Sequence, residues 1–381
     1  MNVLKSIFKL LCGFAIGIIA GLLIAAVGIV CFTDTTFAEF LGKLQSARFA
    51  DAMLAATTAV LIFIISSYFL ILLHEAGHLI AGLLSGYKFV SFRILSYTFI
   101  KEDGHLRVKR FSISGTAGQC LLVPPELPLE RIPTGWYNFG GVFANILAII
   151  LILPIFWIID NPYVVEGATI FCFTGLFLII LNGVPMKIAG SNNDGYNMLN
   201  LRKNLTGKRG FADALRINAL LQNGMRLKDM PSEWFEIPAE INYKDPFEVS
   251  IPLTAASRLI DKLDFNASRA LFEKIYEEKE ELIAIYSQEI ACELIFLRLV
   301  TGNTEGAAEL LTERTKKYIE TYRRTMSSKE RVMCAIYLYK EKDREKATSV
   351  YDSLLARKDR YLMQGEVLSD LAIMRTILER D

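Results

Sequence analysis

Residues 53–84 read MLAATTAVLIFIISSYFLILLHEAGHLIAGLL, an uncharged apolar run broken only near its end. The run exceeds the roughly 20 residues that a helix needs to cross a bilayer. Its last part, LILLHEAGHLIAGLL (70–84), contains His74, Glu75 and His78. Ionisable groups at membrane depth are costly, and they persist where they pair, line a wet cavity or bind a ligand. The stretch therefore predicts a spanning helix that carries a functional site.

Three more apolar runs reach spanning length, at residues 10–32, 140–159 and 168–184. The run at 10–32 is longer than the apolar core of a cleaved signal peptide, so we interpret it as a retained anchor. Apolar residues make up 52% of the chain and are concentrated before about residue 185, while charged residues dominate after it. We predict a mainly α-helical protein with about four transmembrane helices and a soluble C-terminal half.

Basic residues predict the orientation of these helices. Lys5 and Lys9 precede the first apolar run, the segment 86–138 is rich in Lys and Arg, and a basic cluster follows the last run. Such segments face the cytosol, which places both termini there. No organelle-targeting signal is recognisable, so we expect the protein in the bacterial inner (plasma) membrane. The net charge of +1 gives no reason to expect a nucleic-acid partner.

The sequence HEAGH fits the HExxH metal-binding pattern. On a helix, positions i and i+4 share one face, so His74 and His78 can hold one metal ion through their imidazole nitrogens. Glu75 is then placed to act as a general base on a water molecule whose pKa a zinc ion has lowered. We predict Zn²⁺ as the cofactor.

A catalytic zinc site takes three protein ligands, so a third donor is required. The remaining histidine, His105, lies in a charged turn (KEDGHLRVK), where a solvated histidine is the commoner case. Asp194 lies after the last apolar run and is followed by Gly195, which allows a tight turn beside a ligand. We favour Asp194 as the third ligand and keep His105 as the weaker alternative.

Three features together resemble the site-2 protease family of intramembrane zinc metalloproteases: HEAGH, GGVFAN at the start of the third run, and an Asn…Pro…Asp-Gly element at the end of the fourth. The resemblance covers about residues 53–200. It implies that His74, His78 and Asp194 hold zinc and that Glu75 activates water. It also implies that Asn182 contacts the substrate strand and that Asn145 is a second polar, substrate-binding position in the membrane core.

The sequence departs from the family in one respect. The segment MKIAGSNN separates Pro185 from Asp194, and this spacing is longer than is usual in the family. Asn192 or Asn193 is an alternative donor at this point, although neutral amides are poor zinc ligands.

Between the second and third runs, residues 87–115 predict a β-hairpin. YKFVSFRILSYTFI and HLRVKRFSISG are rich in β-branched and aromatic residues, and Asp103-Gly104 between them is a turn signal. An exposed strand edge can hold an extended peptide by adding it to the sheet. We therefore expect an edge strand that presents substrate, the alternative being a hairpin that only packs over the helices.

The C-terminal part is predicted to be helical. Three similar stretches at 262–279, 300–319 and 340–358 recur about every 39 to 40 residues and resemble degenerate tetratricopeptide-like repeats. Stacked repeats present a concave surface for a cytosolic protein partner. A helical bundle without a partner is the alternative. We thus expect a membrane-embedded metalloprotease core at 1–200 and a cytosolic α-helical domain at 205–381.

Together these features predict an intramembrane zinc endopeptidase that cleaves membrane-anchored proteins or peptides near the cytosolic half of the bilayer. The alternative is an inactive relative that anchors a helical-repeat scaffold. Three intact residues disfavour the alternative, since a purely structural core gains from replacing His74, Glu75 and His78 with leucine. A transporter requires a polar pathway through several spans, and the apolar runs outside HEAGH carry no charge.

Overall fold

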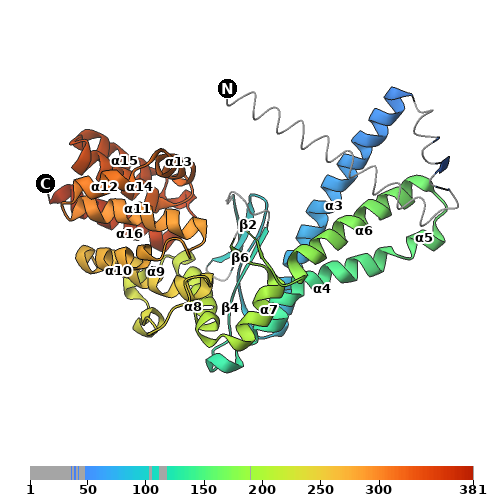
Figure 1. Cartoon of the computed structure of the whole chain (residues 1–381), viewed down its shortest axis with the longest axis horizontal. Helices are drawn as coiled ribbons and strands as arrows, with labels where there is room; N and C mark the ends of the chain where they lie inside the picture. Colours follow the sequence, from blue (N-terminus) through green and yellow to red (C-terminus); the bar gives the residue numbers. More distant parts are fainter. Residues whose placement is uncertain are drawn as a thin grey trace. The chain divides into compact units, whose positions relative to one another are not determined.

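Figure 1 shows a computed structural model of the protein, which describes residues 48–102, 105–110, 118–188 and 190–380 together with Thr36, Ala38, Glu39 and Gly42. The described chain is mainly helical and contains a small antiparallel sheet. It divides into two compact units. The first comprises the described residues up to Ile80 with Phe139–Val184, and the second comprises Ala81–Asn138 with the residues from Pro185 onward. The predicted span at 10–32 lies outside the described residues.

Three apolar stretches in the described chain are long and apolar enough to cross a membrane: Met53–Leu84, Leu129–Ile158 and Pro162–Gly183. The helices that form them are α3 (Phe49–Leu84), α4 (Thr134–Ile152), α5 (Ile155–Ile158) and α6 (Pro162–Gly183). Pro154 lies between α4 and α5, where its missing N–H and its ring interrupt the helix. The apolar helices predicted at 53–84, 140–159 and 168–184 are therefore present.

Two helices begin earlier than predicted, α4 at Thr134 and α6 at Pro162. The start of α6 has a clear cause, because Asn161 Oδ1 accepts hydrogen bonds from the backbone N–H groups of Tyr163 (3.0 Å) and Val164 (3.3 Å). Pro162 occupies the first turn, where no backbone donor is needed. Glu166, which lies between the apolar runs 140–159 and 168–184, is inside α6.

Small residues allow the apolar helices to approach closely. A Cβ atom added to Gly77 of α3 would lie 2.2 Å from the carbonyl oxygen of Gly140 on α4. A Cβ atom on Gly175 of α6 would lie 3.0 Å from the side chain of Ile149 on α4. Helix packing of this kind relies on close van der Waals contact rather than on burial from water.

The sheet has four antiparallel strands in the order β3-β2-β1-β4: β1 (Lys88–Ile94), β2 (Tyr97–Glu102), β3 (His105–Arg110) and β4 (Gly118–Val123). The predicted hairpin is thus only the β2–β3 part of a larger sheet. The first predicted arm is two strands because the chain reverses at Leu95, whose φ is 54°. Buried Arg93 supports this turn by donating from Nη1 to the Leu95 carbonyl oxygen (3.0 Å). The predicted turn at Asp103-Gly104 lies outside the described residues.

One side of the sheet packs on a helix of the same unit. Val90 of β1 and Leu121 of β4 are buried against Ala219 of α8 (Leu205–Gln222). Tyr137 donates from its hydroxyl to the carbonyl oxygen of Cys120 in β4 (3.0 Å). The edge strand β4 is therefore engaged by neighbouring elements, whereas β3 ends the sheet on its other side with mostly exposed side chains.

The helices after the sheet and after α6 are α7 (Asp194–Lys203), α8, α9 (Pro246–Asp261), α10 (Phe265–Glu277), α11 (Ala284–Val300), α12 (Thr304–Leu310), α13 (Glu313–Tyr322), α14 (Ser327–Ala335), α15 (Arg344–Ala356) and α16 (Gln364–Glu379). A π-helical turn, Ile336–Lys340, continues α14. Helix α11 is the centre of the apolar core, with Ile290, Leu294, Phe296 and Leu297 all fully buried. Residues 290–297 of α11 are buried on every side of the helix, and Figure 1 shows α11 among its neighbouring helices.

Four helix ends in this region share one kind of turn. Each contains a residue with positive φ: Gly224 (88°), Leu263 (63°), Gly302 (85°) and Lys342 (60°). The next amide donates back to a carbonyl in the last turn of the helix, in bonds such as Met225 to Leu220 and Asn303 to Arg298. After the last three turns, Asp264, Asn303 and Asp343 cap the following helix. The turn recurs at intervals of 39, 39 and 40 residues.

Candidate metal centre

The two histidines of HEAGH face one another on α3. Their Nε2 atoms lie 3.1 Å apart, and the rings meet edge to face with centroids 4.7 Å apart. Two nitrogens bound to one tetrahedral zinc ion at about 2.0–2.1 Å are separated by about 3.3 Å. The α-helix, which places positions i and i+4 on one face, has therefore brought His74 and His78 to the separation that a shared metal ion needs.

Space for an ion beside these nitrogens comes from a glycine on α4. A Cβ atom added to Gly141 would lie 2.6 Å from the Nε2 atoms of both His74 and His78. Real Cβ atoms do not approach other atoms so closely, so a larger residue at this position would occupy the point that both imidazoles face. The absence of a side chain at Gly141 fits a bound ion there.

Asn145 lies one helical turn after Gly141 on α4 and is fully buried. Its Nδ2 atom lies 3.4 Å from His74 Nδ1, and its Oδ1 atom has no hydrogen-bond partner among the described residues. Rotating the amide by half a turn exchanges these two atoms. Oδ1 would then accept the Nδ1–H of His74, which is the tautomer that frees Nε2 to bind a metal.

The third predicted ligand joins this pair. One ligand atom from each of His74, His78 and Asp194 lies within 4.8 Å of the other two. Asp194 is the first residue of α7 and is half-buried. Among the described residues, His74, His78 and Asp194 are the group of histidine, cysteine or carboxylate side chains whose three ligand atoms all lie this close to one another.

The long insert before Asp194 folds back on itself. Residues Lys187–Ile188 (β5) pair with Ser191–Asn192 (β6). Asn193 closes the loop, because its backbone N–H donates to the Met186 carbonyl oxygen and its Oδ1 accepts the Met186 N–H, both at 3.1 Å. The two ends of the insert MKIAGSNN, Met186 and Asn193, are thus held together, and a hairpin absorbs the unusual spacing between Pro185 and Asp194.

The alternative third ligands occupy other roles or places. Asn193 Oδ1 also accepts the Tyr196 N–H (2.9 Å), so Asn193 is the N-cap of α7. Asn192 lies in β6, and its side-chain nitrogen and oxygen are buried without a partner among the described residues. His105 is the exposed first residue of β3 and pairs with Glu102. The structure leaves His105 outside the cluster.

The role expected for Gly195 is wrong. Gly195 lies inside helix α7, and its φ is not among the positive values found in the described chain. The tight turn near the ligand is made instead by Gly190, whose φ is 86°. The α-helix explains the difference, because Asn193 caps α7 and so the helix already includes Gly195.

The other two predicted site residues lie on the apolar helices. Glu75 directly follows His74 on α3 and is half-buried. Asn182, also half-buried, lies in the last turn of α6 and donates from Nδ2 to the Leu178 carbonyl oxygen of its own helix (3.0 Å). This bond uses the amide N–H₂ of Asn182 and holds the side chain along α6.

Comparison of the chain with protein-family models, with curated proteins and with solved structures gives no match. The candidate centre therefore rests on its own residues. Sequence reasoning missed Gly141, and it gave Asn145 a substrate-binding role and not its position beside His74, but a signal was present. These two residues are four positions apart in GGVFAN and so share one face of α4.

Proposed function

We propose that the protein is an intramembrane zinc endopeptidase of the site-2 protease type, which hydrolyses peptide bonds of membrane-anchored proteins or peptides. The observation that carries this proposal is the convergence of ligand atoms from His74, His78 and Asp194. Two imidazoles and one carboxylate form a donor set suited to catalytic zinc, and they leave a coordination position open. The site residues themselves fit the ion, since Gly141 leaves room beside both histidines.

When bound, zinc supplies Lewis acidity, which makes water easier to deprotonate and a carbonyl group easier to attack. The chain supplies the remaining functions. The Glu75 carboxylate takes a proton from the attacking water and passes it to the leaving amine. Asn145 holds His74 in the tautomer that presents Nε2, and so acts as a positioning residue.

The proposed site lies at the cytosolic end of the α3 span. His74 and His78 occupy the last third of the apolar stretch Met53–Leu84. The basic residues between 86 and 138 favour a cytosolic position for the segment that follows it. Cleavage would therefore occur in or near the cytosolic half of the bilayer, and both termini would face the cytosol of a bacterial cell.

Substrate presentation is proposed for the edge strand β3. This strand ends the sheet, and Leu106 (64% exposed) and Val108 (56% exposed) present apolar side chains beside its backbone. Such an edge can pair with an unwound substrate strand. Asn182 would contact that strand through its amide oxygen. In the alternative, β3 packs over the membrane helices and takes no part in binding.

The helices after α7 are proposed to form a degenerate helical-repeat domain that binds a cytosolic protein. The regular recurrence of the positive-φ turn supports this proposal, because a constant interval is the mark of a stacked repeat. A helical bundle without a partner would not require four equivalent turns. An inactive relative of the protease family would keep this domain while losing the need for His74, Glu75 and His78.

The proteolytic activity is tested in cells that make the Glu75→Gln variant in place of the wild-type protein. The full-length form of at least one single-span membrane protein should accumulate in their membranes, and its cleavage product should disappear, while the purified variant keeps its zinc. Identical membrane proteins in the two strains, with zinc in neither purified protein, would favour the inactive scaffold. Glu305→Gln, an exposed position on α12, is the matched control.

A further inference from the structure

The C-terminal helices line a partly open cavity of about 180 Å³ that is separate from the candidate metal centre. One part of its wall is apolar and includes Leu253 and Ile260 of α9 and Phe272 of α10. Another part is acidic and includes four carboxylates: Glu289 and Glu293 of α11, and Glu366 and Asp370 of α16. The cavity therefore combines a hydrocarbon surface with a negatively charged end.

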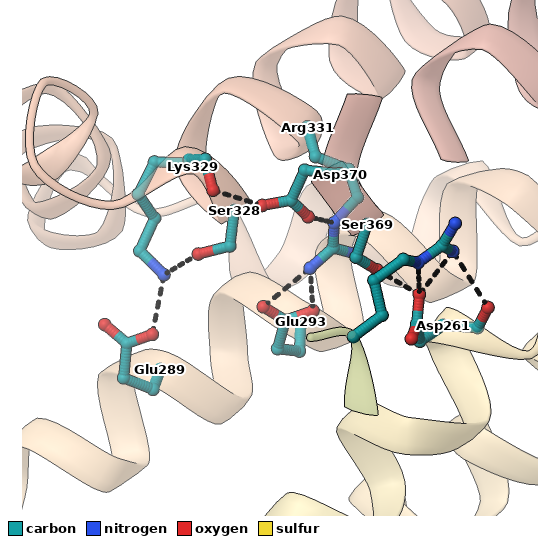
Figure 2. Close-up of polar contacts among 10 residues, drawn as sticks. Asp261, Glu289, Glu293, Ser328, Lys329, Arg331, Ser369 and Asp370 are labelled. Carbon is teal, nitrogen blue, oxygen red and sulfur yellow. Dashed lines mark hydrogen bonds and ion pairs between the residues drawn. The ribbon is translucent and has the colours of Figure 1, made fainter. Parts of the chain in front are cut away.

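Two cationic side chains of α14 compensate three of these carboxylates (Figure 2). Lys329 Nζ donates to Glu289 (2.6 Å). Arg331 donates from Nη2 to both oxygens of Glu293 (3.0 and 2.8 Å) and from Nε to Asp370 (2.6 Å). Each of the three carboxylates thus has an ion pair, as a buried charge requires, although two cations face three anions.

Glu366 is the exception. The described residues offer its side chain no hydrogen bond or ion pair, and it remains partly exposed toward the cavity. Burial, together with the nearby carboxylates of Asp370, Glu289 and Glu293 and against the opposing effect of Lys329, raises the pKa of Glu366 to about 7. Four carboxylates against two cations leave the ionised cavity with an excess of negative charge. The missing partner is a cation.

Arg331 gives a second, independent indication of a ligand. Its side chain is only 5% exposed and lines the cavity, yet its Nη1 atom has no hydrogen-bond partner among the described residues. A buried donor left unsatisfied is unfavourable, so this atom calls for an acceptor. A ligand carboxylate at this point would face Glu293 and Asp370, so the complementary acceptor is a neutral carbonyl oxygen.

We propose that this cavity binds a lysine or arginine side chain of an extended peptide segment. The cationic head meets Glu366, the alkyl stem lies on Leu253, Ile260 and Phe272, and a backbone carbonyl accepts from Arg331 Nη1. A metal ion does not fit as well, because the described carboxylates of the cavity do not bring three ligand atoms within the 4.8 Å that the histidine centre meets.

Calorimetric titration of the full-length protein in detergent at pH 8 tests the proposal. The probe is acetyl-Ala-Ala-Lys-Ala-Ala-amide, compared with its arginine, norleucine and glutamate analogues and with butylamine. The lysine and arginine peptides should bind at least about ten-fold more tightly than the norleucine peptide, because one charge-assisted contact is lost. Butylamine should also bind more weakly, since it lacks the carbonyl.

Two variants identify the site. Glu366→Gln should weaken the lysine peptide about ten-fold or more, and it should fold, because it removes an uncompensated charge. Ser257→Leu keeps every charge and fills the cavity from α9, and should also abolish binding. Glu305→Gln on the exposed face of α12 should have no effect. Any of three results would overturn the proposal. The norleucine peptide or butylamine could bind as tightly as the lysine peptide, neither cationic peptide could bind, or both variants could bind the lysine peptide as the wild type does.

Discussion

Two clusters of ionisable side chains in this protein differ in their charge balance. In the candidate metal centre, the atoms that converge belong to His74, His78 and Asp194, which all offer electron pairs. In the C-terminal helices, carboxylates are matched by Lys329 and Arg331. A cluster of donors suggests a cation from outside, whereas a cluster of ion pairs suggests a structural role. Glu366 lies between these cases, because it adjoins the ion-paired network without an ion pair of its own.

The largest effect is expected for Glu75→Gln. The change removes the proposed base but none of the three proposed metal ligands, so the rate of peptide cleavage should fall about 10²- to 10⁴-fold while zinc content stays constant. Cleavage of a natural substrate in purified, reconstituted protein, followed with zinc analysis of the same sample, measures both. A fully active Glu75→Gln enzyme would show that the donor cluster is not catalytic in the way proposed.

Arg331→Met should produce the largest loss of stability. It leaves Glu293 and Asp370 buried without their cation, which is expected to lower the free energy of unfolding by about 3–5 kcal/mol. Urea unfolding of the detergent-solubilised chain, monitored by circular dichroism, gives this value. Lys316→Ala breaks an exposed ion pair with Glu313 and should cost less than about 0.5 kcal/mol. Similar losses in the two variants would remove the distinction between a buried network and a solvated pair.

Asn145→Ala should weaken zinc binding about 10- to 100-fold, because His74 loses the group that orients its ring. Competition with a chelating dye measures this affinity without any need for a substrate. Asn182→Ala is the matched control, since Asn182 donates to its own helix. If Asn145→Ala bound zinc as tightly as the wild type, the role of Asn145 would lie with the substrate instead.

The smallest effect concerns the dependence of stability on pH. The folded-state pKa of Glu366, about 7, exceeds its ordinary value of 4.5. The protonated carboxyl group of Glu366 therefore makes its full stabilising contribution below pH 4.5, and this contribution is lost as the pH rises through 7. The free energy of unfolding should fall by on the order of 2 kcal/mol across this window. Glu366→Gln should flatten that part of the stability curve, and an unchanged slope would contradict the assignment.

Much of the fold was accessible from the sequence because the strongest signals are local. The apolar runs at 53–84, 140–159 and 168–184 predicted helices, and the spacing of HEAGH predicted that His74 and His78 share a face. The recurring capped turns are also local, since Asp264, Asn303 and Asp343 each cap the helix that follows. Such features depend on neighbours within a few residues.

The features that the sequence did not predict depend on contacts between distant segments. The strand β4 was missed because its pairing with β1 joins residues that are far apart in the chain. The role of Gly141 is visible only when α4 packs against α3. The hairpin β5–β6 is short and polar, so the hydrogen bonds of Asn193 that bring Asp194 back toward Met186 could not be read from hydropathy.

Metal content of the purified full-length protein tests the central claim most directly. Elemental analysis should find about one zinc ion per chain in the wild type and in His105→Ala, and markedly less in Asp194→Ala, because only Asp194 belongs to the proposed donor set. Zinc that is lost with His105 and retained without Asp194 would contradict the proposed centre, and so would a wild-type protein that takes up no zinc after reconstitution.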